Sequence, residues 1–263
     1  MQDIAFILAG FLVGTVVGLT GVGGGSLMTP ILIFVFGVKP YMAVGTDLLF
    51  AAFTKMGGTV SLARARIVDW KIVGQTALGS IPAALATLYL LQRLGPANPA
   101  TQAIMTTTLG LALLLTASAT FYKVVRGKAP PVHIAADRIA EATRARHWAL
   151  PMVFGAVIGV LVTLTSVGAG AIGVIVLMLL YPTLPLPRIV AADIAHAVPL
   201  TLVAGLGHAS IGSVDWPLLL KLLAGSLPGI WIGSQLMRRT SDRVIRSLLS
   251  VLLAYAGMKL MSI

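Results

Sequence analysis

The sequence contains no cysteine, and only 10% of its residues are charged. Without cysteine the chain has no disulfide, no thiolate metal site and no cysteine nucleophile. Soluble domains carry roughly 25% charged residues, so this chain has too few charges for an ordinary water-exposed surface. Hydrophobic residues make up 57% of the sequence, and their runs are too many and too long for one buried core. The composition therefore predicts an all-α integral membrane protein.

Acidic residues are especially scarce, with 8 Asp and Glu against 19 Lys and Arg. In a membrane protein such an excess of cations indicates topology, because Lys and Arg gather on cytoplasmic loops. No basic stretch is interleaved with aromatic residues on a soluble module, so no nucleic-acid partner is expected. The sequence also lacks an HExxH motif and a convincing serine–base pair, so it predicts neither an enzyme nor a cofactor.

Five hydrophobic segments precede a polar bridge at residues 126–147, and five follow it. We interpret 1–125 as a first transmembrane repeat, 126–147 as a cytoplasmic linker and 148–263 as a second repeat. The second segment of each set is shorter than the ~20 residues that a full span needs. Whether these two segments cross or re-enter stays open, which gives eight to ten membrane segments. The expected segments are 4–20, 27–38, 42–62, 71–92 and 102–125, then 148–165, 171–184, 189–211, 217–236 and 244–262.

The two sets form an internal repeat. Val68-Asp69-Trp70 returns as Val214-Asp215-Trp216, and Gly79-Ser80-Ile81-Pro82 returns as Gly225-Ser226-Leu227-Pro228. The same offset of 146 residues relates Asp47 to Asp193. Two hydrophobic sequences often match by chance, because both are built from a few residue types. Polar motifs that recur at one shared offset are not expected by chance, so they indicate a true internal repeat.

Loop charges indicate how the two copies are oriented. Arg64 and Arg66 precede the first Val-Asp-Trp motif, whereas the equivalent loop at 210–214 has no cation. The next loop reverses this bias: residues 95–99 are uncharged, and the counterpart carries Arg238, Arg239, Arg243 and Arg246. Equivalent loops with opposite charge lie on opposite sides of a membrane. The sequence therefore predicts inverted repeats, the architecture that alternating-access transporters use.

A glycine-rich stretch interrupts the helical pattern in each repeat, as Thr20-Gly21-Val22-Gly23-Gly24-Gly25-Ser26 and as Leu164-Thr165-Ser166-Val167-Gly168-Ala169-Gly170. Each glycine costs a helix interior roughly 1 kcal/mol relative to alanine. A break at membrane depth is tolerated only where it is buried in protein or lines a wet cavity. The breaks offer free backbone N–H groups and hydroxyls, including Thr29, which together suit an oxyanion. The spacing of Gly10, Gly14 and Gly18 fits close helix packing instead.

Ionisable residues inside the membrane are costly and mark pathways. Asp47 and Asp193 fall within the third segment of each repeat, and His196 shares a helix face with Asp193. We interpret these three as proton-coupling groups. The alternatives are acids with a structural role, a hydrogen-bonded interior histidine, and a divalent-cation pathway, although a metal site normally takes more ligands. Lys55, deep in the third segment, suits an anionic substrate.

Gly21-Val22-Gly23-Gly24-Gly25-Ser26-Leu27 through Pro30, followed by Ala43-Val44-Gly45-Thr46, resembles the TauE/SafE sulfite exporter family. The pattern recurs in the second half, and the resemblance covers essentially the whole chain. It implies a multi-pass protein of the bacterial inner membrane, built of two inverted repeats. It also implies transport of sulfite, sulfoacetate or other sulfur-containing or organic anions. This chain departs from the family where it has Asp47 in place of a frequent serine.

The sequence thus predicts a secondary transporter that exports a small sulfur-containing or organic anion by alternating access, coupled to protons. A proton-coupled divalent-cation transporter that uses the intramembrane Asp and His residues is the alternative. No resident metal is expected, and the oligomeric state stays open, a homodimer included. The candidate substrate-binding residues are Thr20, Gly23, Gly24, Gly25, Ser26, Thr46, Lys55, Thr165, Ser166, Gly168 and Gly170.

Overall fold

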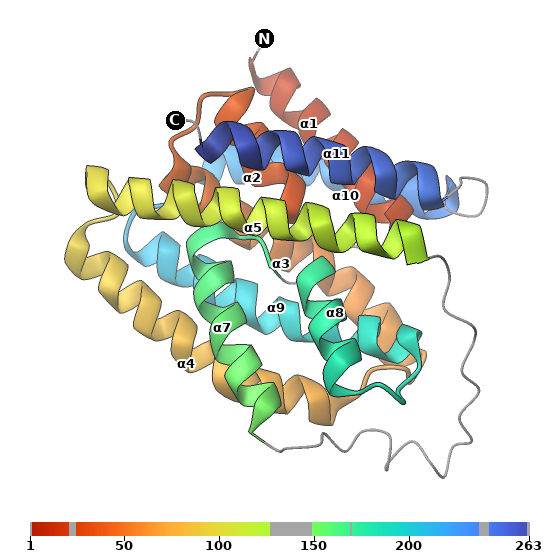
Figure 1. The fold of residues 1–263 in the computed structure, drawn as a ribbon. Helices are drawn as coiled ribbons and strands as arrows, with labels where there is room; N and C mark the ends of the chain where they lie inside the picture. The colour runs from red at the N-terminus through yellow and green to blue at the C-terminus, as the bar shows by residue number, and fades with distance from the viewer. Residues whose placement is uncertain (1, 21–24, 127–148, 169, 237–241, 262–263) are drawn as a thin grey trace.

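Ten α-helices account for nearly all of the chain that the computed structural model describes, namely residues 2–20, 25–126, 149–168, 170–236 and 242–261 (Figure 1). No β-strand occurs in those ranges. The predicted linker lies outside the described residues, apart from Arg126. The helices are α1 (Gln2–Thr20), α2 (Gly25–Phe34), α3 (Pro40–Arg64), α4 (Trp70–Leu94), α5 (Pro99–Arg126), α7 (Leu150–Thr165), α8 (Ala171–Leu180), α9 (Leu186–Ser210), α10 (Trp216–Leu236) and α11 (Asp242–Met261).

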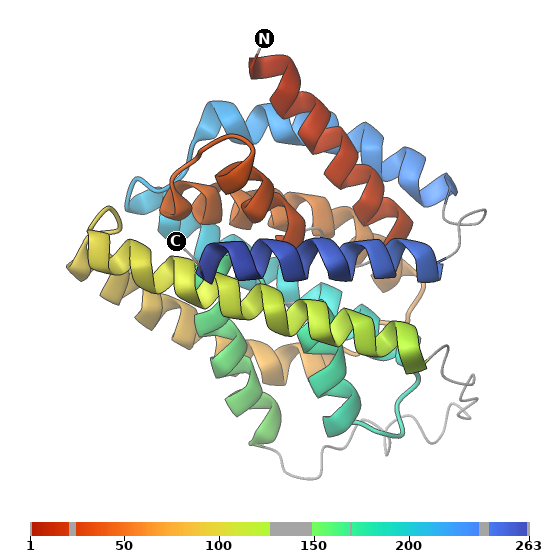
Figure 2. The same ribbon diagram turned by 45° about the horizontal axis from the view of Figure 1, so that its top comes forward.

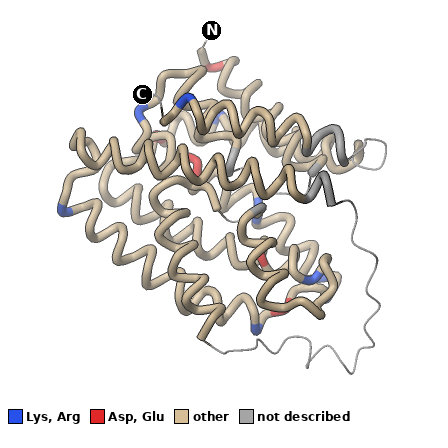
Figure 3. Tube along the Cα trace, viewed as in Figure 1, with Lys and Arg blue, Asp and Glu red and all other residues tan. Residues whose placement is uncertain are grey.

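Five of these helices, α1, α4, α5, α9 and α10, are long and apolar enough to cross a membrane. This confirms the prediction of an all-α integral membrane protein, and charged residues are sparse along the helices (Figure 3). By contrast, α2 and α8 have 10 residues each. At about 1.5 Å per residue each would reach about halfway through a hydrocarbon core of ~30 Å. The two short segments expected from the sequence are therefore half-length helices.

The main contacts join helices of different repeats. The pairs are α1 with α10, α4 with α7, α5 with α11, and α3 with α9. Exchanging the two repeats converts α1–α10 into α7–α4 and leaves α5–α11 and α3–α9 as they are. Figures 1 and 2 show α5 and α11 running side by side along one face. The pairing fits two similar halves, while their inverted orientation in a membrane stays a prediction.

Glycines allow α1 and α10 to cross at backbone contact. A Cβ built on Gly14 would lie 2.4 Å from the carbonyl oxygen of Ser226, and one on Gly229 would lie 2.3 Å from that of Phe11. The α4–α7 crossing repeats this geometry, since a Cβ on Gly159 would lie 2.3 Å from the carbonyl oxygen of Ser80. Small residues let membrane helices approach closely. The glycines in these close contacts are Gly10, Gly14, Gly18, Gly225, Gly229 and Gly233 at the first crossing, and Gly79, Gly155 and Gly159 at the second.

The central pair of helices is α3 and α9. In α3 every residue from Ala43 to Ala52 is buried, so other parts of the protein enclose this stretch on all sides. A helix buried all round belongs to the core. Any polar side chain on this stretch is therefore withdrawn from both lipid and solvent.

The repeated Val-Asp-Trp motif begins the fourth helix of each repeat. Asp69 precedes α4, and its Oδ1 accepts hydrogen bonds from the backbone N–H groups of Lys71 at 3.1 Å and Ile72 at 3.4 Å. Asp215 precedes α10, and its Oδ1 accepts from the N–H of Leu218 at 2.9 Å. Asp is a favoured N-cap because it satisfies N–H groups that lack helical partners. The motif thus recurs because both helices need the same start.

Candidate functional site

Three charged side chains are buried on the central helix pair: Asp47 and Lys55 on α3, and Asp193 on α9. Their exposed fractions are 0%, 7% and 3%. The ammonium of Lys55 interacts electrostatically with both carboxylates. Across the described ranges, no other lysine, arginine, aspartate or glutamate is buried. We call Asp47, Lys55 and Asp193 the buried charge cluster.

Asp47 is held by the half-length helix of its own repeat. Thr29 on α2 donates a hydrogen bond from Oγ1 to Asp47 Oδ2 at 2.5 Å. The other carboxylate oxygen, Oδ1, is buried and has no hydrogen-bond partner among the described residues. A buried carboxylate is costly unless it is paired and hydrogen-bonded. Thr29 and Lys55 both favour the ionised form of Asp47.

The break of the second repeat also reaches Asp47. The Ser166 side chain interacts with the Asp47 carboxylate and is itself buried, and its hydroxyl makes no hydrogen bond within the described part of the chain. Ser166 ends α7 with φ 59° and ψ 2°, in the left-handed region. That conformation costs a non-glycine residue roughly 1–2 kcal/mol, and the equivalent position of the first repeat is Gly21. Serine at this strained position places a hydroxyl beside the acid, which glycine cannot do.

Asp193 packs against the other half-length helix. A Cβ added to Gly173, the third residue of α8, would lie 1.9 Å from Asp193 Oδ1. The carboxylate therefore lies against the first turn of α8, where the helix dipole favours negative charge. Each buried acid thus contacts the half-length helix of its own repeat, Asp47 through Thr29 and Asp193 at Gly173.

His196, one turn after Asp193, joins α9 to α4. Its Nε2 lies 2.8 Å from Ser80 Oγ, in a buried hydrogen bond between the repeats. His196 also interacts electrostatically with Lys55, which makes it a neighbour of the buried charge cluster. Asp47, Asp193 and His196 do not form a group that could hold a metal ion in the described structure.

The remaining candidates lie in and around the two breaks. Thr165 Oγ1 is used within the second break, where it accepts from the N–H of Val167 at 3.1 Å and donates to the carbonyl of Leu161 at 2.6 Å. Gly168 and Gly170 have φ of +134° and +129°, values that L side chains rarely adopt. Thr46 Oγ1 accepts from the N–H of Asp215 at 3.0 Å, which ties α3 to the loop before α10.

In the first repeat, Gly25 begins α2 and Thr20 ends α1. Gly23, Gly24 and the side chains of Thr20 and Ser26 lie outside the described residues. Electrostatic interactions therefore link Lys55 to Asp47, Asp193 and His196, and Ser166 interacts with Asp47. The structure places Thr46 and Thr165 in contacts that hold the framework.

The chain is similar to known membrane proteins along nearly its whole length. A family model described as sulfite exporter TauE/SafE matches residues 6–260. The chain belongs to this family. Among its relatives, the probable membrane transporter protein YjnA of Bacillus subtilis (strain 168) is 36% identical over 259 residues, which cover 98% of this chain and 100% of YjnA.

Two further relatives show how widely the family pattern extends. The probable membrane transporter protein YunE of the same Bacillus strain is 26% identical over 277 residues, covering 99% of this chain and 97% of YunE. The probable membrane transporter protein MJ0441 of Methanocaldococcus jannaschii is 26% identical over 270 residues, covering 96% and 92%. No significant match to a solved structure was found. Family membership and the apolar helices identify a multi-pass membrane transporter, and the bacterial relatives support the inner membrane.

Two residues that contact members of the candidate site, Ser80 and Gly173, were not among the predicted residues. Ser80 lies in the repeated Gly-Ser-x-Pro motif, so its recurrence at a fixed offset is a signal that could have marked it. Gly173 has no such signal, because only its contact with Asp193 reveals its role. Lys221, a second lysine within a hydrophobic segment, forms a salt bridge with Asp3 and lies outside the buried charge cluster.

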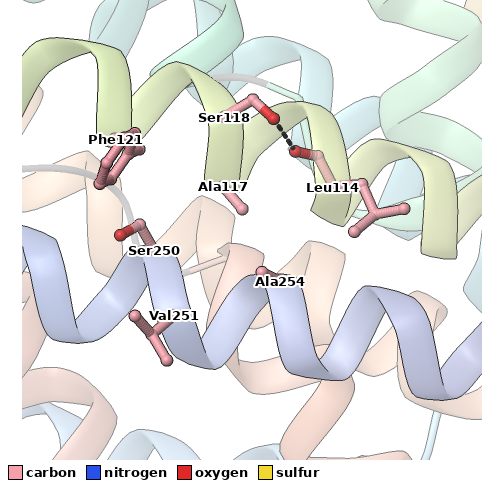
Figure 4. Close-up of a pocket in the computed structure, with 7 residues that line it drawn as sticks. All are labelled: Leu114, Ala117, Ser118, Phe121, Ser250, Val251 and Ala254. Atoms are coloured by element: carbon pink, nitrogen blue, oxygen red, sulfur yellow. Dashed lines mark hydrogen bonds between the residues drawn. The ribbon is translucent and has the colours of Figure 1, made fainter.

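A shallow hollow between α5 and α11 is separate from this site, and none of the predicted site residues lines it (Figure 4). Its lining is largely apolar and carries no charge, so it does not suit an anion. The lining residues are Leu114, Ala117, Ser118, Phe121, Ser250, Val251 and Ala254.

Replacing Thr29 with valine should destabilise the protein by about 1–3 kcal/mol, because the buried Asp47 carboxylate loses a hydrogen bond. Valine has nearly the same shape, so packing changes little. Thermal unfolding in detergent measures the effect, and Thr29→Ser should retain the wild-type midpoint more closely. A midpoint for Thr29→Val equal to that of the wild type would show that Thr29 does not support the carboxylate.

Proposed function

We propose that this TauE/SafE family member is a proton-coupled secondary transporter that exports a small sulfur-containing or organic anion. The observation that carries the proposal is one buried lysine that interacts electrostatically with two buried carboxylates, on a helix pair that joins the two repeats. Buried ionisable groups within membrane helices are expensive, and transporters use them as substrate and proton sites.

The anion is proposed to bind near Lys55. The ammonium provides the positive charge that an oxyanion needs, and the Ser166 hydroxyl, which interacts with Asp47, makes no hydrogen bond among the described groups. The start of α2 supplies further N–H groups, where the helix dipole favours negative charge. The family description, which mentions sulfite, supports a sulfur oxyanion as the first substrate to try.

The proton is proposed to bind the carboxylates beside Lys55. When an anion approaches Lys55, the ammonium can no longer fully compensate both acids, so protonation of one acid becomes favourable. Binding of anion and proton are then linked in the same site. The half-length helices touch both acids, and we propose that 1–125 and 148–263 act as inverted repeats that move around this centre in alternating access.

Flux in proteoliposomes tests the proposal directly. Sulfite, thiosulfate, sulfoacetate and one divalent metal are supplied in turn, with and without an imposed pH gradient. We expect saturable flux of at least one anion and faster flux with the gradient. The Asp47→Asn variant should lose most of the gradient effect while anion exchange persists, since asparagine cannot take up the coupling proton.

Metal flux without anion flux would contradict the anion assignment and would favour the divalent-cation alternative. Anion flux that is equally gradient-dependent in Asp47→Asn would instead leave the substrate class standing and assign the coupling proton to another group. The two results therefore separate the identity of the substrate from the identity of the proton site.

A further inference from the structure

We infer that the site selects monovalent anions over divalent ones, because the buried charge cluster carries one cation against two carboxylates. This inference rests on the proposed anion transport. With all three groups ionised, Asp47, Lys55 and Asp193 together carry one net negative charge. No other ionic side chain is buried in the described ranges.

The internal repeat makes this imbalance informative. The carboxylate is duplicated, as Asp47 and Asp193, but the lysine is not: the position equivalent to Lys55 at the 146-residue offset is Thr201. Thr201 is buried, and its hydroxyl donates to the carbonyl of Ala197 within α9 at 2.8 Å. The site therefore has two acids and a single ammonium to share among them and the substrate.

The half-length helices do little to change this balance. Asp193 already lies against the first turn of α8 at Gly173, so the positive end of that helix is facing a carboxylate. Asp47 is bonded to Thr29 on α2. The positive end of α8 and the hydroxyl of Thr29 are thus directed at the acids before any substrate arrives.

Charge balance then decides the valence of the substrate. A monoanion that binds together with one proton leaves the net charge of the cluster unchanged. A dianion with one proton adds a further negative charge in a place without solvent. The cost of burying an ion grows with the square of its charge, so the dianion is disfavoured twice, by desolvation and by repulsion.

Counterflow with matched anions tests this inference at a single pH. Methanesulfonate and sulfate form one pair, and acetate and malonate form a second pair of a carboxylate monoanion and dianion. We expect the monoanion to be exchanged about tenfold faster or more in at least one pair. Equal exchange within every transported pair would overturn the valence inference while leaving anion transport intact. If none of the four anions nor sulfite is exchanged, the proposed function fails and the inference fails with it.

A variant that removes one charge from the buried charge cluster gives a more specific test of the inference. Asp193→Asn removes the carboxylate that stays ionised when Asp47 takes up the proton, and it keeps the shape of the side chain, so dianion exchange should rise relative to monoanion exchange by about tenfold. Asp3→Asn is the matched control, because it removes a carboxylate from the peripheral Lys221 pair and should leave the ratio unchanged. A ratio in Asp193→Asn equal to that of the wild type would contradict the role of charge balance. Because the readout is a ratio of two substrates, a general loss of activity does not imitate it.

Discussion

Replacing Lys55 with glutamine should reduce anion exchange by about 100-fold or more. Lys55 is the buried cation that interacts with both Asp47 and Asp193. Removing one partner from a buried ionic group costs about 3–5 kcal/mol, and each 1.4 kcal/mol is tenfold in an equilibrium constant. The anion loses its counter-charge and also meets two uncompensated carboxylates. Exchange of the best anion in proteoliposomes, normalised to inserted protein, measures the loss.

Lys221→Gln is the control, because it removes a lysine charge from the protein at a position outside the buried charge cluster. Lys221 is also a lysine of a hydrophobic helix, but it pairs with the exposed Asp3 at the edge of the bundle. An exposed ion pair contributes about 0–1 kcal/mol, so this variant should exchange the anion within about twofold of the wild-type rate. Comparable losses in Lys55→Gln and Lys221→Gln would mean that the loss comes from altered charge and not from the site.

A double variant separates binding from folding. Lys55→Gln removes the ammonium that interacts with both buried acids and should lower the melting temperature. Adding Asp47→Asn returns the cluster to its original net charge of one negative, so stability should recover. Anion exchange should stay low, because no ammonium is present. Recovery of exchange together with stability would show that Lys55 serves only to neutralise the acids.

Most of the fold was predictable from the sequence because each helix is a hydrophobic run with a polar or glycine-rich end. The half-length helices are the instructive case. The segment expected at 171–184 is shorter than the ~20 residues of a full span, and the structure ends its helix, α8, earlier, at Leu180. The pairing of helices across repeats was less accessible, because it depends on which faces fit together. The breaks themselves were visible, since consecutive glycines oppose a helix interior.

The candidate site was predictable as far as its charges are concerned. Asp47, Asp193 and Lys55 stand out because a charge inside an apolar segment is costly and usually functional. In the structure all three are buried, and Lys55 interacts electrostatically with both acids. Their partners were harder to predict. Ser80 meets His196 only because α4 packs on α9, and Gly173 matters only because Asp193 lies against it. Sequence reports which residues are unusual, whereas packing determines what each of them touches.

The glycine crossing of α1 and α10 leads to a second large expected effect, on stability. Gly14→Ala should destabilise the protein by about 3 kcal/mol, the upper end of the usual range for overpacking. The added Cβ would lie 2.4 Å from the carbonyl oxygen and 2.7 Å from the Cα of Ser226. These are backbone atoms that cannot rotate away, so the two helices must separate along their whole crossing. The melting temperature in detergent, followed by tryptophan fluorescence, measures the change.

Gly74→Ala is the matched control on α4, since nothing lies within 4 Å of a Cβ at that position. The same substitution there gains helix propensity of about 1 kcal/mol without a clash, so its melting temperature should equal or exceed that of the wild type. A lower melting temperature therefore indicates a backbone contact at the glycine, whereas a higher one reflects only the greater helix propensity of alanine. If Gly14→Ala were as stable as Gly74→Ala, the backbones of α1 and α10 would not be in contact. The glycines along α1 and α10 would then need an explanation other than close helix packing.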